Sequence, residues 1–202
     1  MPTRWYQEKK REHFYKQAKK EGYRARSAFK LKQIQNRFRI LKQGNAVIDL
    51  GAAPGSWSQV AKEIVGEKGT VIGIDLLPIQ SLEGVTFIEG DMTDDESIQK
   101  IKSLINDKEA DTILSDMSPD ISGNYSVDQA RSIQLCEQAF KTCNELLEPG
   151  GNFVCKVFVG EDFQEFLQKI KKQFQAVKQF SPKASRKTSS EIYIVAKSFK
   201  KS

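Results

Sequence analysis

The sequence has little histidine and little cysteine, and it lacks long apolar runs. Its 202 residues include one histidine, His13, and three cysteines, Cys136, Cys143 and Cys155. The cysteines are odd in number and have no C-x-x-C spacing, so we expect core residues of a reduced protein without a disulfide framework or a metal site. No apolar run approaches the roughly 18 residues that cross a bilayer, and the charged start is unlike a signal peptide. We therefore expect a soluble, cytoplasmic protein with no membrane partner.

A chain of this length can bury roughly 70% of its extended surface in one core. No internal repeat or low-complexity linker interrupts it. We predict a single domain over residues 1–202, in which 1–43 form a basic N-terminal helical extension and 44–202 form the core. We expect a monomer.

The net charge of +6 hides an uneven distribution. Residues 1–43 carry 14 basic and 3 acidic side chains, 44–168 carry 8 and 22, and 169–202 carry 10 and 1. Two basic ends around an acidic middle are typical of a polyanion-binding surface, although a run of lysines is also compatible with a solvated helix face. The RNA-binding candidates, interleaved with aromatic residues, are Lys9, Lys10, Lys16, Lys19, Arg24 and Arg26.

Apolar runs alternate with amphipathic stretches along the rest of the chain. We predict a helical region to about residue 42, then strands at 46–50, 70–76, 85–89, 112–116, 152–158, 176–180 and 192–197. We predict further helices at 56–65, 94–106, 127–147 and 161–174, the third ended by Pro149-Gly150-Gly151. This order predicts an α/β fold whose mostly parallel, seven-stranded sheet is covered on both faces. The last two strands have no helix between them and should form an antiparallel hairpin at the sheet edge.

A glycine-containing turn follows the first predicted strand, at Asp49-Leu-Gly-Ala-Ala-Pro-Gly-Ser-Trp57. In open α/β sheets, ligands bind beyond the carboxyl ends of the strands. Gly51 and Gly55 allow close approach of the backbone, and the helix start offers free N–H groups. Neither the dinucleotide pattern G-x-G-x-x-G nor a phosphate-binding G-x-x-x-x-G-K-[ST] is present.

Four carboxylates occupy the ends of successive predicted strands: Asp49, Asp75, Asp91 and Asp116. Each one alone is equally well explained as a helix cap or turn former. Together they repel a pyrophosphate and suit a cationic ligand with a ribose, since an acidic residue about 20 residues after the glycine turn accepts bonds from ribose hydroxyls. S-adenosylmethionine has a sulfonium, an amino group, a ribose and no phosphate.

At this point the sequence resembles the FtsJ/RrmJ-type (RlmE) ribosomal RNA 2′-O-ribose methyltransferases, a branch of the class I S-adenosylmethionine-dependent enzymes with a Rossmann-like fold. The resemblance runs from about Tyr15 to Val195. Besides the glycine turn, the motifs are Gly22-Tyr-Arg-Ala-Arg-Ser-Ala-Phe-Lys-Leu31, Ser115-Asp-Met-Ser-Pro119, Gly150-Gly-Asn-Phe-Val-Cys-Lys156 and Ser189-Ser-Glu-Ile-Tyr193.

The resemblance implies the roles of particular residues. The implied cofactor-binding residues are Gly55, Trp57, Asp75, Asp91 and Asp116. The positions of Asp49 at a strand end and of Gly51 in the glycine turn add these two residues. The implied catalytic set is Lys30, Asp116, Lys156 and Glu191. One departure is Ser56, where many members have a second glycine.

The chemistry of methyl transfer to a hydroxyl is consistent with that set. The hydroxyl must lose its proton, and imidazole is the usual base. The one histidine, His13, however lies in the basic N-terminal extension. Lysine is the remaining candidate, and Lys156 interrupts the buried strand Phe153-Val-Cys-Lys-Val-Phe-Val159. If neutral, Lys156 accepts the proton; if charged, it orients the hydroxyl.

The resemblance implies a target, namely a uridine ribose in the A loop of 23S ribosomal RNA, as naked RNA or as part of a ribosomal particle. One alternative is a 2′-O-methyltransferase of the tRNA anticodon loop, and another is a non-catalytic RNA-binding assembly factor. An amino-methyltransferase should have Asn or Asp-Pro-Pro-aromatic where this chain has Asp116-Met-Ser-Pro119. A base C5-methyltransferase needs a nucleophilic cysteine there. Cys136 and Cys143 are instead seven residues apart on one face of a predicted helix, a spacing that is typical of packing residues.

Overall fold

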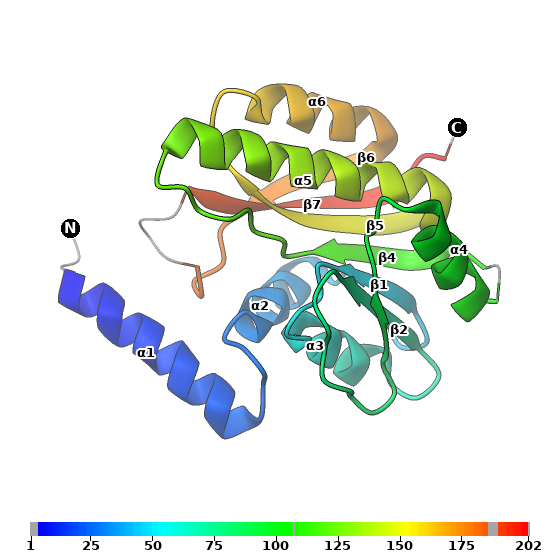
Figure 1. The fold of residues 1–202 in the computed structure, drawn as a ribbon, viewed down its shortest axis with the longest axis horizontal. Coiled ribbons are helices and arrows are strands. Elements are labelled where there is room, and N and C mark those ends of the chain that lie inside the picture. Colours follow the sequence, from blue (N-terminus) through cyan, green and yellow to red (C-terminus); the bar gives the residue numbers. More distant parts are fainter. Residues whose placement is uncertain (1–3, 107, 186–189, 202) are drawn as a thin grey trace.

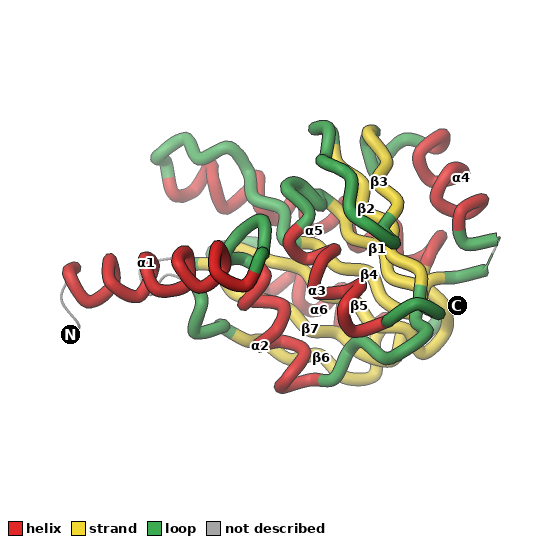
Figure 2. Tube along the Cα trace, turned by 90° about the horizontal axis from the view of Figure 1, so that it is seen from below, coloured by secondary structure: helices red, strands yellow, loops and turns green. Residues whose placement is uncertain are grey.

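A computed structural model describes residues 4–106, 108–185 and 190–201, with side chains from residue 12 onward. A single twisted sheet runs through the molecule between two helical layers (Figure 1). Helices α4, α5 and α6 cover one face, and α2 and α3 cover the other. Helix α1 extends from the side of the body, as both views show (Figure 2).

The predicted elements are present, and most of their bounds agree within two residues. The helices are α1 (Arg4–Glu21), α2 (Ala28–Phe38), α3 (Ser56–Val65), α4 (Asp95–Leu104), α5 (Tyr125–Leu146) and α6 (Phe163–Gln173). The strands are β1 (Ala46–Leu50), β2 (Thr70–Asp75), β3 (Thr86–Glu89), β4 (Ala110–Ser115), β5 (Leu147–Phe158), β6 (Phe174–Phe180) and β7 (Glu191–Phe199).

The strand order is β3-β2-β1-β4-β5-β7-β6. The first five strands are parallel, and β7 runs antiparallel to both β5 and β6. The predicted hairpin is therefore confirmed, and its second strand lies between β5 and the edge strand β6. This insertion places Glu191, at the start of β7, beside the carboxyl end of β5, because Phe158 pairs with Glu191 in the register.

The N-terminal region is two helices and not one continuous segment. Gly22 has φ +78°, a left-handed conformation that ends α1 and that glycine adopts without strain. A short linker, residues 22–27, then leads into α2. A second difference lies at the end of α5, where β5 begins at once at Leu147 and includes the Pro149-Gly150-Gly151 segment predicted only to stop the helix.

Buried apolar residues form one cluster on each face of the sheet. The larger cluster joins α4, α5 and α6 to the sheet, and the smaller one joins α2, α3 and Ala18 of α1. Phe14 of α1 adds an aromatic contact to Phe29 of α2, with ring centroids 5.5 Å apart. The carboxyl-terminal half of α1 is thus attached to the same core as α2 and α3.

A buried polar contact joins β1 to α3 within the smaller cluster. Asp49 is 1% exposed, and its Oδ2 accepts a hydrogen bond of 2.7 Å from the Ser58 hydroxyl. Burial raises the pKa of Asp49 to about 7, against its ordinary value of 3.8, and the charges of Asp116 and Asp75 also raise it. The Ser58 hydrogen bond partly offsets this effect.

The raised pKa predicts that Asp49 lowers stability as pH rises. Between about pH 4 and pH 7 the unfolded chain ionises Asp49 while the folded chain keeps the proton, so the free energy of unfolding falls, and above pH 7 the loss is complete. The Asp49→Asn variant lacks this pH-dependent change in the free energy of unfolding. Urea unfolding at several pH values should show its stability relative to the parent increasing by on the order of 4 kcal/mol over that window and then levelling. A constant difference from pH 4 to pH 8 would contradict the prediction.

Candidate active site

The turn between β1 and α3 has the conformation of a ligand-binding loop. Gly51 and Gly55 have φ values of +67° and +100°, and Gly55 is the N-cap residue of α3. A Cβ on Gly51 would lie 2.1 Å from Cγ of Met117, so the loop after β4 packs directly on this turn. The first N–H groups of α3 have no partner within the helix, and that of Ser58 donates to the Asp49 carboxylate.

Asp75 and Asp91 stand at the ends of β2 and β3 as predicted, and each also makes local bonds. Asp75 accepts backbone N–H groups from Ala53 through Oδ2 and from Leu77 through Oδ1, both at 2.9 Å. Asp91 accepts the backbone N–H and the hydroxyl of Thr93 through Oδ1, the bonds of a turn former. A carboxylate oxygen can accept more than one hydrogen bond, so these contacts orient the acids and leave them able to bind a ligand.

Trp57 points into the core. Its side chain is 2% exposed, its indole N–H donates to the Ser27 carbonyl at 2.9 Å, and its ring lies 5.7 Å from that of Tyr193. The Trp57 ring is therefore a core group whose N–H is already paired with the protein. The neighbouring Ser56 hydroxyl is 2.7 Å from the Ser27 hydroxyl, so its side chain also turns toward the linker and does not narrow the loop.

The four residues of the implied catalytic set lie together, although they come from four parts of the chain. Lys156 Nζ donates to the Asp116 backbone carbonyl at 2.6 Å and lies 3.4 Å from Asp116 Oδ1. Lys30 Nζ donates to Glu191 Oε1 at 2.6 Å and lies 4.0 Å from Asp116 Oδ1. We call Lys30, Asp116, Lys156 and Glu191 the KDKE cluster.

The KDKE cluster is largely withdrawn from water. The side chains of its two lysines are 10% and 6% exposed, and those of its acids are 16% and 13% exposed. Charges at this depth are costly unless they are paired. Two lysines facing two carboxylates satisfy this requirement.

The register of β5 and β7 explains how the KDKE cluster forms. Lys156 pairs with Tyr193, and Glu191 lies two residues earlier on the same strand, so all three side chains share one face of the sheet. Leu114 and Val154 belong to the smaller apolar cluster on that face, and two residues on, at the strand ends, come Asp116 and Lys156. The helix that covers this face, α2, contributes Lys30.

Tyr193 is a member of the site that the sequence analysis did not assign. Its hydroxyl donates to Asp116 Oδ1 at 2.6 Å, and Lys30 Nζ lies 5.5 Å from the centre of its ring. Burial and the charges of Asp116 and Glu191 raise the pKa of Tyr193 well above its ordinary value, so the phenol stays protonated and donates. Two-residue alternation along a strand was the available signal, because it puts position 193 on the same face as Glu191.

The basic candidates occupy different environments. Lys16 is exposed on α1 and pairs with Glu12 at 2.6 Å, and Lys19 is exposed one turn later. The side chains of Lys9 and Lys10 lie outside the described residues. Arg24 is half-buried, and its guanidinium donates to backbone carbonyls of the protein.

Arg26 lies near the KDKE cluster. It is half-buried in the linker, and its charge acts on Tyr193, whose pKa it lowers slightly against the raising effects. Arg26 therefore combines a position beside the site with the positive charge proposed for an RNA contact.

The cysteines are packing residues. All three are buried, and the Cys136 thiol donates to the Lys156 carbonyl at 2.9 Å. Burial raises the pKa of Cys143 and of Cys155 well above the ordinary value, so these groups remain thiols. This environment is unlike that of a nucleophilic cysteine.

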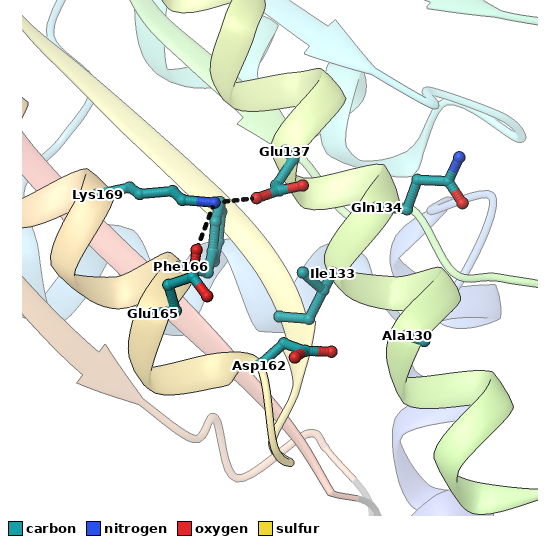
Figure 3. Close-up of a pocket in the computed structure, with 8 residues that line it drawn as sticks. All are labelled: Ala130, Ile133, Gln134, Glu137, Asp162, Glu165, Phe166 and Lys169. Atoms are coloured by element: carbon teal, nitrogen blue, oxygen red, sulfur yellow. Dashed lines mark hydrogen bonds and ion pairs between the residues drawn. The ribbon is translucent and has the colours of Figure 1, made fainter.

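A pocket of about 320 Å³ lies between α5 and α6, on the opposite side of the sheet from the KDKE cluster (Figure 3). Lys169 of α6 reaches across it to Glu137 of α5 at 2.7 Å and also pairs with Glu165 on its own helix at 3.0 Å. Its lining includes none of the predicted site residues. Lys169 is paired with two glutamates at the surface, and we interpret the pocket as a packing gap between α5 and α6.

Within the described part of the chain, no helix has the length and apolarity needed to cross a membrane. Over the same residues, no three His, Cys, Asp or Glu side chains are grouped so that they could hold a metal ion.

Comparison with known proteins identifies relatives over nearly the whole chain. The model of the FtsJ-like methyltransferase family matches residues 23–199. A protein named Ribosomal RNA large subunit methyltransferase E, from Methanosarcina acetivorans, is 48% identical over 190 residues, covering 94% of this chain and 69% of the relative. Proteins of the same name from Methanocaldococcus jannaschii and Acinetobacter baumannii are 47% and 45% identical, and cover 97% and 98% of this chain and 82% and 91% of the relatives.

Solved structures agree with this result. A Plasmodium falciparum structure described as a ribosomal RNA methyltransferase superposes with a TM-score of 0.80 at 31% identity, covering 89% of this chain and all of that one. A fibrillarin/Nop5p complex, with a TM-score of 0.60 at 18% identity over 85% of this chain and 83% of that one, shares the fold alone. The class I methyltransferase fold and the family match over most of the sequence lead to one conclusion: the chain belongs to the FtsJ-like methyltransferase family.

Proposed function

We propose that this protein transfers a methyl group from S-adenosylmethionine to a ribose 2′-hydroxyl in large-subunit ribosomal RNA, at a uridine of the A loop of 23S RNA. The observation that carries the proposal is the convergence of Lys30, Asp116, Lys156 and Glu191 at the carboxyl end of β4 and β5. The relatives named Ribosomal RNA large subunit methyltransferase E support the choice of ribosomal RNA.

The residues at the strand ends fit S-adenosylmethionine. The turn between β1 and α3 leads into the start of α3, which offers N–H groups to the carboxylate of this ligand. Asp75 lies where ribose hydroxyls are bound in this class of sheet. Leu76 and Leu77, which follow it, are 67% and 63% exposed, and such apolar side chains suit the faces of an adenine ring. The carboxylates of Asp75, Asp91 and Asp116 at the strand ends favour a cation.

S-adenosylmethionine, when bound, would supply the methyl group from its positively charged sulfur, which would leave as a neutral thioether. Lys156 then has to control the hydroxyl proton. Two of its contacts go to Asp116, and they fix Nζ in direction. The position left on Nζ can hold the hydroxyl by a hydrogen bond or receive its proton.

Lys30, Glu191 and Tyr193 position Lys156 and Asp116. The 2.6 Å bond between Lys30 and Glu191 holds the second lysine of the cluster 4.0 Å from the Asp116 carboxylate. Tyr193 donates to Asp116 and so fixes the carboxylate that Lys156 faces. We therefore assign Lys156 to proton control and the other groups to orientation and charge balance.

RNA binding is assigned to α1 and to Arg26 of the linker. Helix α1 extends from the side of the body, and its exposed lysines can follow a phosphate backbone (Figure 2). The proposed enzyme acts as a monomer in the cytoplasm.

The substrate is tested with S-adenosylmethionine labelled in its methyl group. We expect label in isolated large-subunit RNA or in large-subunit particles, and its loss when the target uridine already carries a 2′-O-methyl group. Label in tRNA alone would favour the anticodon-loop alternative. Cofactor binding without label in any RNA would support the non-catalytic assembly factor.

Replacing Lys156 tests the proposed chemistry. The Lys156→Ala variant should lower the single-turnover methylation rate by roughly two to four orders of magnitude, because proton transfer loses its positioned group. Calorimetric titration should show cofactor affinity retained. Lys197→Ala is the matched control, since Lys197 is a strand lysine that donates to the Phe38 carbonyl away from the KDKE cluster. An active Lys156→Ala protein would remove Lys156 from its assigned role.

Replacing lysines of α1 tests the RNA surface. Substituting alanine for Lys9, Lys10, Lys16 and Lys19 should weaken RNA binding and flatten its dependence on salt, by about one unit of slope per lost phosphate contact. Lys68→Ala and Lys100→Ala, at exposed positions in the acidic middle of the chain, serve as controls. An unchanged slope in the α1 variant would return these lysines to a solvated helix face.

A further inference from the structure

The linker between α1 and α2 is bound along α3. The Gln59 side chain accepts the backbone N–H of Arg24 at 2.8 Å and donates to the Gly22 carbonyl at 3.1 Å. The Tyr23 hydroxyl donates to Glu63 at 2.7 Å. The helix that begins at the proposed cofactor loop is therefore also the helix that fixes the linker in place.

The Arg24 side chain then crosses from the linker to two loops at the end of the sheet. One guanidinium nitrogen donates to the Pro54 carbonyl at 3.0 Å, and the other donates to the Ser81 carbonyl at 2.7 Å. Pro54 belongs to the turn between β1 and α3, and Ser81 to the loop between β2 and β3. The rigid, planar fork of a guanidinium suits it to hold two acceptors at a fixed separation.

The guanidinium is also packed closely against the turn. Its central carbon lies 5.7 Å from the centre of the Phe87 ring. A Cβ placed on Gly55 would be 2.7 Å from the guanidinium and 3.1 Å from a ring carbon of Phe87. The absence of a side chain at Gly55 thus makes room for Arg24 behind the turn.

We propose that Arg24 is a positioning residue for the cofactor, which it serves by joining the two loops that flank the S-adenosylmethionine site. The proposal rests on the proposed function, because it assumes that this cofactor binds between the β1–α3 turn and the loop that follows Asp75. It gives Arg24 a role different from the RNA contact expected of an arginine in the basic leader. Both hydrogen bonds end on carbonyl groups of the protein, and they direct the guanidinium inward toward the turn.

The experiment compares the parent with Arg24→Ala and Arg24→Lys by calorimetric titration with S-adenosylmethionine and with its demethylated product. Both variants should bind either ligand about tenfold more weakly, the size expected when one hydrogen bond to a charged group no longer contributes. Lysine keeps the charge but cannot span both carbonyls, so it should not rescue binding. In steady-state assays the KM for the cofactor should rise while kcat at saturating cofactor is kept.

RNA binding separates this role from a phosphate contact. The slope of RNA affinity against salt should be unchanged in Arg24→Ala, whereas a lost phosphate contact would lower it by about one unit and lysine would restore it. Arg37→Ala removes an exposed guanidinium from α2 and is the matched control for cofactor affinity. A role in stability alone would lower the melting temperature of both Arg24 variants without raising the KM.

Two outcomes would overturn the assignment. In the first, the parent binds cofactor and Arg24→Ala binds it equally well, so the proposed function stands and the role of Arg24 fails. In the second, the parent itself binds no S-adenosylmethionine, and the proposed function fails together with the role of Arg24.

Discussion

The pairing of two buried lysines with two carboxylates is the interaction on which the site depends. Lys30 and Lys156 are nearly removed from water, and each remains tolerable there because an acid lies within ion-pair distance. Removing one partner would leave an uncompensated charge in a poorly hydrated environment. The long antiparallel register of β5 and β7 holds Lys156 opposite Tyr193 and so brings these charges together.

Asp116 joins the rest of the KDKE cluster to the proposed cofactor site. Its carbonyl and its carboxylate both face Lys156, its carboxylate accepts the Tyr193 hydroxyl, and its charge raises the pKa of Asp49 one strand away. Its position one residue beyond β4 explains these several contacts. The adjoining Met117 covers Gly51, so the loop after β4 contacts both halves of the site.

The N-terminal residues have two separate roles. Helix α1 carries exposed lysines away from the body, whereas the linker, residues 22–27, contacts the proposed cofactor loop. A basic sequence is therefore not uniformly a nucleic-acid surface. Arg24 donates its hydrogen bonds to carbonyl groups of the protein itself, and Lys30 forms an ion pair with Glu191.

The sequence by itself determined which strands and helices follow one another along the chain. It also determined the glycine turn and the acids that end the strands. Periodicity, turn residues and buried apolar runs are local properties, and they suffice for these features. The motifs also named Lys30 and Glu191, which are 161 positions apart, but only by resemblance. Only the tertiary structure showed their contact, because it requires β7 to lie between β5 and β6, and strand order depends on packing over the whole sheet. It also decided the inward turn of Trp57, the place of Tyr193 and the partners of Arg24, since side-chain direction follows from neighbours that are distant in sequence.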